Sequence, residues 1–436
     1  MMDSISIFWF RRDLRLDDNK GFFEALNSGN KVVPIFIFDK NILDKLPKKD
    51  ARLDFIHSRI THIHHKLQEK GGNLLTFYST PEEAFEKLSQ QFEIDTVFTN
   101  KDYEPYARER DRNIEAFLSS KNIGFKSFKD HVIFEEKEVV KDDGNPYKVY
   151  TPYSKKWLAK FSTIDFNFYP SEAHLDQIFT SESKAIHSMS DLGFEPSGIE
   201  TPDYDVSQQI IDEYEAKRNF PAVKGTSKLG LHLRFGSYST RKAVQEARKS
   251  DNITFLKELI WREFFIQILW HYPHTVDQAF KPQYDRIEWR NNEDDFKRWC
   301  EGKTGYPLVD AGMRELNATG FMHNRVRMLV GSFLCKHLLI DWRLGEAYFA
   351  EKLLDFEQAS NVGNWQWVAG CGVDAAPYFR IFNPTTQIKK FDKDLQYIKK
   401  WVPEFQELTY AKEMVDHKFA RERCLTTYKS ALAVDS

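Results

Sequence analysis

The stretch Ile5-Ser6-Ile7-Phe8-Trp9-Phe10 begins a repeating pattern that decides the fold of the first 130 residues. Four more short runs rich in apolar residues follow, at 32–38, 74–78, 96–99 and 125–128. The runs lack polar alternation, which is typical of strands buried on both faces of a sheet. The polar segments between them, such as 54–70 and 81–92, are long enough to be crossover helices. The pattern predicts a parallel, Rossmann-like α/β domain over residues 1–130.

The remaining chain divides into an irregular part and a helical part. Residues 131–200 contain turn-forming and scattered Ser, Pro and Gly residues, which indicate an interdomain connection partly wrapped over the surface. Its expected anchors are aromatic: Tyr147, Tyr150, Tyr153, Trp157 and Phe161. From residue 201 to 436 the apolar spacing is helical, which predicts an all-α domain. The clearest helical segments are 253–271, 307–316, 324–339 and 347–355.

Bulk composition excludes several classes of protein. The 62 Lys and Arg residues are balanced by 65 Asp and Glu, so a globally cationic nucleic-acid coat is excluded. No run approaches the roughly 18 to 20 apolar residues of a membrane span. The four cysteines form no C-x-x-C pair, which argues against a metal site and a disulfide framework and favours a reducing, cytoplasmic location. Aromatic residues make up 15% of the chain, an unusual share.

A small-residue segment at 224–236 is a candidate phosphate loop. Its Thr226 and Ser227 hydroxyls and its backbone N–H groups could bind an anion, although the segment matches no P-loop. Residues 224–250 carry seven Lys or Arg against the single acidic residue Glu246. An ordinary interhelical loop with a solvated basic face is the alternative interpretation.

Two helical segments place polar and ring side chains together. Glu258, Trp261, Arg262 and Phe265 follow the i, i+3, i+4, i+7 spacing, so one helix face could stack on a planar ring and bind its edge. A core tryptophan beside a Glu258–Arg262 ion pair is the alternative. In the second segment Asn324 and Met328 lie one turn apart with Arg327 adjoining, and here the alternative is a helix capped by asparagine.

The segment 355–367 joins carboxylates, amides and two indoles within thirteen residues. Buried carboxylates need donors, which Arg327 or Arg262 could supply. The neutral amide of Asn361 suits a ligand atom that changes protonation or redox state. A capped turn between helices is the alternative.

Taken together, six motifs resemble the photolyase/cryptochrome family, most closely its class I-type cyclobutane pyrimidine dimer (CPD) photolyases. The motifs cover nearly the whole chain: FWFRRDLRLDDN at 8–19, GTSKLG at 225–230, ELIWREFF at 258–265, EGKTGYPLVDAGMREL at 301–316, MHNRVRM at 322–328 and NWQWVAGCGVDAAPYFRIFNPTTQ at 364–387. The resemblance implies an antenna-binding α/β domain and a helical domain that holds FAD. It also implies blue-light-driven DNA repair, in which excited FADH⁻ passes an electron to a flipped-out pyrimidine dimer.

The resemblance assigns roles to residues of this chain. It implies FAD contacts at Tyr214, Thr226, Ser227, Leu229, Arg262, Arg327, Asp355, Glu357 and Asn361, with Arg327 paired to Asp355 and Asn361 facing flavin N5. It implies contacts to the dimer at Glu258, Trp261, Asn324, Met328 and Trp367. It implies an electron-transfer chain through Trp365, Trp342 and Trp289.

The sequence departs from the family pattern at three positions. Glu357 stands where relatives usually have Asp, and Gly230 replaces a more usual Ser in the phosphate loop. Ala107 falls where folate-binding relatives have a carboxylate for the pterin. An 8-hydroxy-deazaflavin or another flavin is therefore favoured over methenyltetrahydrofolate as the antenna.

Two other functions within this family are open. A cryptochrome-like photoreceptor would use the same flavin and tryptophans, but residues 385–436 do not resemble a long regulatory tail. A (6-4) photoproduct photolyase is disfavoured because residues 322–325 lack the expected pair of histidines. The expected partner is UV-damaged DNA, with no metal, no membrane and no obligate protein partner, and the expected state is a monomer.

Overall fold

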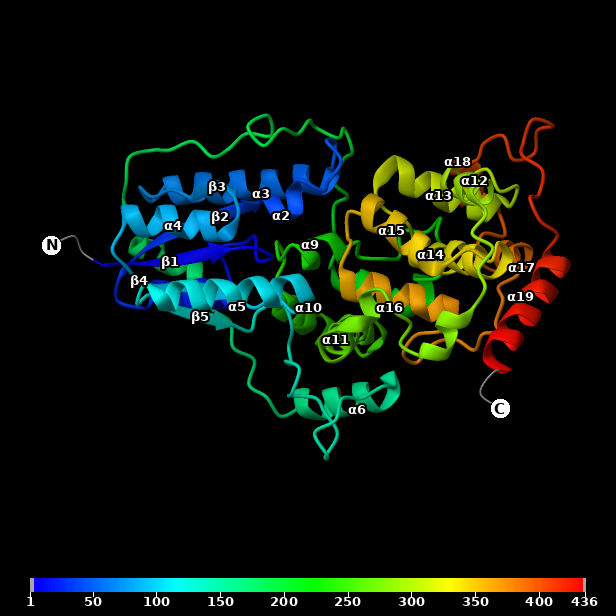
Figure 1. Ribbon diagram of the computed structural model, residues 1–436, viewed down its shortest axis with the longest axis horizontal. Coiled ribbons are helices and arrows are strands. Elements are labelled where there is room, and N and C mark those ends of the chain that lie inside the picture. The colour runs from blue at the N-terminus through cyan, green and yellow to red at the C-terminus, as the bar shows by residue number, and fades with distance from the viewer. Residues whose placement is uncertain (1–3, 434–436) are drawn as a thin grey trace. The chain divides into compact units, whose positions relative to one another are not determined.

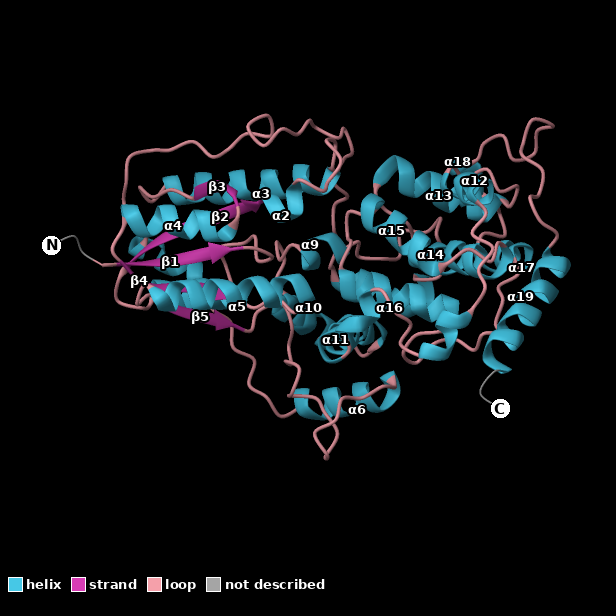
Figure 2. Cartoon of the chain, in the orientation of Figure 1, coloured by secondary structure: helices cyan, strands magenta, loops and turns pink. Residues whose placement is uncertain are grey.

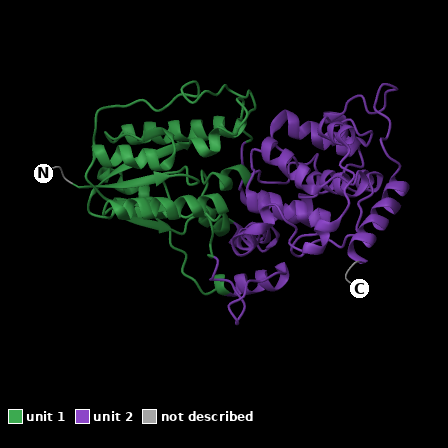
Figure 3. Ribbon diagram, viewed as in Figure 1, with its two compact units in different colours: residues 1–135, 160–202, 229–246 green, residues 136–159, 203–228, 247–436 purple. Residues whose placement is uncertain are grey.

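The structure, a computed structural model, describes residues 4–433. Contacts between Cα atoms divide the chain into two compact units (Figure 3). Unit 1 comprises residues 1–135, 160–202 and 229–246, and unit 2 comprises residues 136–159, 203–228 and 247–436. The predicted domain limits at 130 and 200 stay predictions.

Unit 1 is built on a five-stranded sheet in the order β3-β2-β1-β4-β5, and every neighbouring pair is parallel (Figure 2). Each predicted run is a strand, so the predicted parallel α/β fold is confirmed. The strands are β1 (Ile5–Phe10), β2 (Lys31–Asp39), β3 (Leu75–Ser79), β4 (Ile94–Asn100) and β5 (Gly124–Phe128).

Helices cover both faces of the sheet because alternate side chains of a strand point to opposite sides. Ile5, Ile7 and Trp9 of β1 pack in a core with Phe85 of α4. On the other face Phe8 lies 5.0 Å from the Phe22 ring of α1. Every residue of β1 is buried, whereas the edge strands β3 and β5 are only half-buried. The helices that follow the strands are α1 (Lys20–Leu26), α2 (Lys40–Leu43), α3 (Ala51–Gln68), α4 (Pro81–Gln91) and α5 (Pro105–Ser120) (Figure 1).

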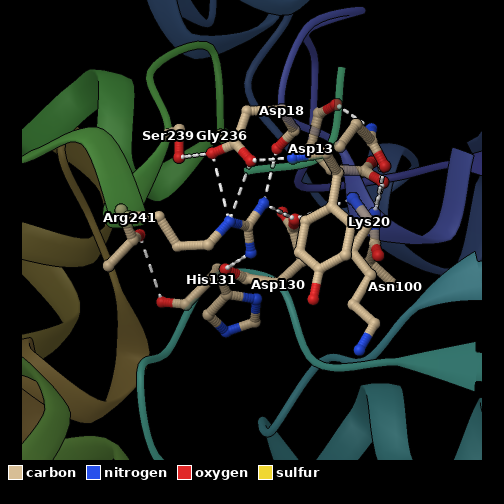
Figure 4. A network of polar contacts seen from close by, with 12 residues as sticks. Asp13, Asp18, Lys20, Asn100, Asp130, His131, Gly236, Ser239 and Arg241 are labelled. Atoms are coloured by element: carbon tan, nitrogen blue, oxygen red, sulfur yellow. Dashed lines mark hydrogen bonds and ion pairs between the residues drawn. The ribbon is translucent and has the colours of Figure 1, made fainter. Parts of the chain in front are cut away.

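A buried polar network joins the 8–19 motif to the later segment 229–246 inside unit 1 (Figure 4). Arg241, on α10 (Thr240–Arg248), donates to the Asp18 carboxylate at 3.0 Å and to Asp130 Oδ1 at 2.8 Å. Arg15 binds both oxygens of Asp130 at 2.8 Å, and Ser239 donates to Asp18. Burial alone would raise the pKa of Asp130, but Arg15 and Arg241 hold that pKa well below its usual range. Asp130 therefore stays ionised, and the network ties the short helix α9 (Gly230–Arg234) and α10 to the strands of the sheet.

Unit 2 is helical in the part of the chain that the structure describes, as the sequence predicts. Its long hydrophobic core includes residues from α12 to α19. The helices are α7 (Gln208–Asp212), α8 (Tyr214–Lys217), α11 (Thr254–His271), α12 (Glu293–Cys300), α13 (Pro307–Thr319), α14 (Asn324–Ser332), α15 (Trp342–Lys352), α16 (Gln358–Ala369), α17 (Pro384–Phe391), α18 (Gln396–Trp401) and α19 (His417–Leu432).

Three expectations about local structure need correction. The irregular connection at 131–200 contains a regular helix, α6 (Tyr150–Phe161), although four of its five aromatic anchors are buried and the fifth, Tyr147, is half-buried. Residues 347–352 of the predicted segment 347–355 are the end of a helix that begins at Trp342, and residues 353–355 lie beyond it. Asp341 caps this helix by accepting from the Arg343 N–H. The segment 324–339 is α14 followed by a π-helical turn at Phe333–His337. The Asp341 cap and the π-helical turn set the ends of these helices, and the spacing of apolar residues does not predict such features.

Over residues 4–433 no helix is long and apolar enough to cross a membrane. Within the same residues no group of His, Cys, Asp or Glu side chains could hold a metal ion.

Candidate functional site

Unit 2 contains a cavity of about 440 Å³, a size typical of small-molecule and cofactor sites. Three helices give the cavity most of its wall: α11, α14 and α16. Gly363 lets α16 lie close to α11, since a Cβ atom there would stand 2.2 Å from the Phe265 ring. The walls therefore depend on a small residue at a point of close helix contact.

The face of α11 predicted from its spacing lines this cavity with Glu258, Trp261, Arg262 and Phe265. The alternative, a Glu258–Arg262 ion pair, is not what forms. Glu258 pairs instead with Arg218, and Arg262 binds Glu357 through two hydrogen bonds of 3.0 and 2.7 Å. Such a bidentate pair fixes the guanidinium plane. Each charged group of this face is thus held by a partner from another segment.

Helix α14 repeats the same spacing with Asn324, Arg327, Met328 and Gly331, all of which line the cavity. The cap of this helix is His323, whose Nδ1 accepts from the Arg325 N–H at 3.2 Å, so the alternative of an asparagine cap is wrong. Arg327 binds both oxygens of Asp355, at 3.1 and 2.9 Å. This is the ion pair that the family resemblance implies.

Asn361 lines the cavity from α16 and is held from behind by Glu346 of α15. The Asn361 amide nitrogen donates to Glu346 Oε1 at 2.8 Å and to the Glu346 carbonyl at 3.1 Å. Burial raises the pKa of the Glu346 carboxyl, with the hydrogen bond from Asn361 opposing the shift. The arrangement places a neutral amide, backed by a carboxyl group, beside the cavity.

The structure brings together most of the residues predicted to contact a flavin or a pyrimidine dimer. Those that line the cavity are Tyr214, Glu258, Trp261, Arg262, Asn324, Arg327, Met328, Asp355, Glu357, Asn361 and Trp367, and Trp365 of the predicted electron-transfer chain lines it too. Of the predicted phosphate-side residues, Thr226 and Ser227 belong to unit 2 but are not part of this lining, and Leu229 falls in unit 1, where it is buried.

Two of the predicted electron-transfer tryptophans stand outside the lining. Trp342 is 2% exposed and begins α15, and Trp289 is half-buried with its ring 6.0 Å from that of Tyr428. Gly345, one turn after Trp342, would place a Cβ atom 2.2 Å from the Trp365 ring. The face of α15 that carries Trp342 is therefore the face that meets Trp365.

Two of the seven cations at 224–250 pair with carboxylates in the fold, so they are not free to bind a phosphate. Arg241 is buried in the network with Asp18 and Asp130. Arg234 is largely buried and pairs with Glu104 at 3.3 Å. Carboxylates distant in sequence neutralise these guanidinium groups, which a local count of charges cannot reveal.

Sequence reasoning missed Arg218, Ser360 and Asn364, which also line the cavity. Arg218 lies four residues after Tyr214, and Asn364 lies three residues after Asn361. Extending the helical i, i+3 and i+4 rule from the predicted residues could have found both.

Acid is expected to weaken the folded protein through His323. This imidazole is 4% exposed, and burial, aided by Arg327 and Arg325, lowers its pKa from 6.5 to about 4. Below about pH 6.5 the imidazole of His323 takes up a proton in the unfolded chain but stays neutral in the folded chain. The free energy of unfolding therefore decreases as the pH falls from about 6.5 toward 4. Between pH 7 and about pH 4.5 this contribution is about 2 to 3 kcal/mol.

Urea unfolding at the two pH values measures this loss. Asparagine caps helices without titrating, so His323→Asn should lower the pH dependence of the free energy of unfolding by that amount. Equal pH dependence in both proteins would contradict a neutral His323.

The chain matches two family models: one described as DNA photolyase over residues 6–173, and one described as the FAD binding domain of DNA photolyase over residues 255–410. The deoxyribodipyrimidine photo-lyase of Alkalihalophilus pseudofirmus is 37% identical over 92% of this chain and 88% of its own length.

Two solved structures share the fold. A bacterial class III photolyase from Agrobacterium tumefaciens is 32% identical with a TM-score of 0.89, covering 100% of this chain and 99% of its own. An archaeal photolyase from Sulfolobus tokodaii, solved with two FAD molecules, is 32% identical with a TM-score of 0.84, covering 98% and 99%. The predicted α/β and helical architecture is confirmed, and the chain belongs to the DNA photolyase family and carries its FAD-binding domain.

Proposed function

We propose that the protein is a deoxyribodipyrimidine photo-lyase that uses FAD and blue light to repair CPDs in DNA. The observation that carries this proposal is the pair of indoles, Trp261 on α11 and Trp367 on α16, which border the same cavity as the Arg327–Asp355 pair and Asn361. Flat rings next to a cofactor-sized cavity suit a flipped-out, base-containing lesion. The same-named relatives of similar length support this function.

The donor set of the cavity fits a flavin. The isoalloxazine edge carries both acceptors and donors, and the cavity offers the paired Arg327 guanidinium and Asp355 carboxylate with the Asn361 amide on another wall. When bound and reduced, FAD supplies after light absorption the electron that opens the cyclobutane ring, and the electron then returns to it. The protein residues orient the cofactor, keep its surroundings ordered and, at Asn361, present an amide to the ring rather than a charge.

Several groups of the cavity have proposed roles toward the DNA. Glu258, held by Arg218, and Asn324, exposed at the start of α14, would hydrogen-bond the polar edges of the dimer, while Met328 would contact its apolar side. Arg380 places its Cζ atom 5.9 Å from the ring centre of Trp367, where a cation could meet a phosphate beside a stacked base. A contact between a cation and a DNA phosphate predicts that the affinity for DNA falls as the salt concentration rises.

The antenna and the cellular setting complete the proposal. We favour a flavin-type antenna, since Ala107 is a buried alanine and Tyr106 donates to Asp39 at 2.5 Å in the α/β unit. The Sulfolobus tokodaii photolyase with two FAD molecules is consistent with that choice. Four free cysteines suit a cytoplasmic location, and we propose that the enzyme acts as a monomer on UV-damaged DNA.

The direct test is repair of damaged DNA by the purified, FAD-loaded protein. Chemically reduced protein is mixed with UV-irradiated oligothymidine and exposed to blue light, and the dimers are counted before and after. Light-dependent loss of dimers is expected. Unchanged dimers in the presence of bound, reduced FAD would reject repair and favour the cryptochrome-like photoreceptor. Repair of (6-4) photoproducts in place of CPDs would identify the protein as a (6-4) photoproduct photolyase.

Trp367→Ala should weaken binding of dimer-containing DNA by about 1 to 3 kcal/mol, because one base loses its stacking partner. Fluorescence anisotropy of labelled, irradiated oligothymidine in the dark measures the change. Trp401→Ala is the matched control, since this half-buried tryptophan of α18 is not part of the cavity lining. Equal affinities of the Trp367 variant and the unmodified protein would place the dimer elsewhere.

A further inference from the structure

A tyrosine outside the cavity lining lies flat against Trp261. The ring centres of Tyr150 and Trp261 are 3.6 Å apart and their planes differ by 7°. Tyr150 is the first residue of α6, within the segment predicted to be an irregular connection, and it is 8% exposed. A parallel contact this close covers one face of the indole.

Hydrogen bonds at both ends fix the position of Tyr150. Its backbone N–H donates to the Asp374 carboxylate at 3.0 Å. Its hydroxyl donates to the carbonyl of Lys257 at 2.8 Å. Lys257 precedes Trp261 by four residues on α11, so the phenol is bound to the same helix face that carries the indole. A shift of the Tyr150 ring would break one of these bonds.

Two further rings restrict the sides of Trp261. Phe264 meets it edge-on at 5.6 Å, and Phe265 lies at 5.6 Å with a tilt of 30°. Trp261 still lines the cavity, so a ligand can reach only the part of the indole that Tyr150 leaves uncovered. These three neighbours restrict the orientation in which the indole can receive a base.

We propose that Tyr150 is a positioning residue for lesion recognition: it holds the plane of Trp261 so that a base of the dimer completes a stack of three rings. The inference rests on the proposed repair function. A cyclobutane-linked pair of bases is rigid and cannot adjust to a misplaced indole, whereas undamaged bases cost more free energy to flip out of the stack. Tyr150 therefore acts on the discrimination between damaged and undamaged DNA, through Trp261.

The test compares Tyr150→Leu with Tyr150→Phe in the FAD-loaded protein, in the dark. Dissociation constants are measured for irradiated and unirradiated oligothymidine of the same length. Tyr150→Leu removes the ring contact and should weaken binding of irradiated DNA about two- to tenfold, while binding of unirradiated DNA stays the same. Tyr150→Phe keeps the ring contact and should retain most of the discrimination.

Tyr153→Leu is the matched control, because Tyr153 is also a buried tyrosine of α6, and its ring centre lies 5.2 Å from that of Phe264. It should lower the melting temperature without changing the ratio of the two dissociation constants. The flavin absorption of each variant verifies that FAD is bound.

The possible failures are distinguishable. Unmodified protein that binds irradiated and unirradiated DNA equally would reject lesion binding itself. Unmodified protein that discriminates, together with Tyr150→Leu that discriminates equally well, would reject only the role of Tyr150. Equal loss of discrimination in the Tyr150→Leu and Tyr153→Leu variants would assign the effect to general loosening of α6 and likewise reject that role.

Discussion

Trp342→Phe is expected to slow the light-driven reduction of oxidised FAD by about tenfold or more, equivalent to at least about 1.4 kcal/mol in the barrier. A phenyl ring is much harder to oxidise than an indole, so the route from the surface to the cavity loses its middle member. The rate is measured from the flavin absorption during blue illumination with an external reductant. Repair by protein reduced chemically beforehand should remain, since that protein needs no electron from the surface.

The expectation depends on how α15 and α16 pack. Trp365 borders the cavity, Trp342 is buried, and Trp289 is partly accessible, so the three proposed members range from the cofactor site toward solvent. The absence of a side chain at Gly345 lets the α15 face that bears Trp342 approach the Trp365 ring. Exposure and helix packing thus support a route that sequence spacing alone does not reveal.

Trp299→Phe provides a matched control for this experiment. Trp299 is fully buried, and its ring centre lies 6.2 Å from that of Trp365, edge to face. It is not a member of the proposed route, so its replacement should leave photoreduction at the normal rate. Normal photoreduction in Trp342→Phe, or slow photoreduction in Trp299→Phe alone, would contradict the assigned order of tryptophans.

Much of the fold could be predicted from local patterns. Runs rich in apolar residues such as Ile5–Phe10 form parallel strands here, because a strand buried on both faces does not need polar alternation. The helix at Tyr150–Phe161 was missed because contacts distant in the sequence help to form it. Its first residues are anchored by long-range contacts, such as that from the Tyr150 N–H to Asp374, and no local spacing reports those.

Helical spacing predicted the members of the site that share one face of α11, but not the residues that pair with them. The spacing of 258–265 placed four cavity residues on α11. Their ionic partners could not be deduced in this way, because Arg218 and Glu357 come from segments about 40 and 95 residues away. The family resemblance supplied the Arg327–Asp355 pair, whose distances the structure then gives.

Breaking the buried network of the α/β unit should have the largest effect on stability. Arg241→Met is expected to lower the free energy of unfolding by about 3 to 5 kcal/mol, the usual cost of leaving buried charges without their partner. Asp18 and Asp130 are each 1% exposed and both accept from Arg241. Urea unfolding, followed by circular dichroism, measures the change.

Lys242→Met separates this effect from the loss of any surface ion pair. Lys242 is the next residue on α10 and pairs with Asp17 at 2.5 Å, but the two side chains are 42% and 45% exposed. Solvent screens such a pair, so the expected cost is about 0 to 1 kcal/mol. In Arg241→Met the Asp130 carboxylate keeps Arg15, whereas Asp18 loses its ionic partner. Adding Asp18→Asn removes this unpaired charge and should recover part of the lost stability. Arg15 and Arg241 hold the pKa of Asp130 below its usual range. The stability that the fold gains from pairing Asp130 with these arginines is therefore present above about pH 4 and declines as the pH falls further. Equal costs for Arg241→Met and Lys242→Met would mean that the network contributes no more than an exposed pair, and that the 8–19 motif is joined to residues 229–246 by packing rather than by charge.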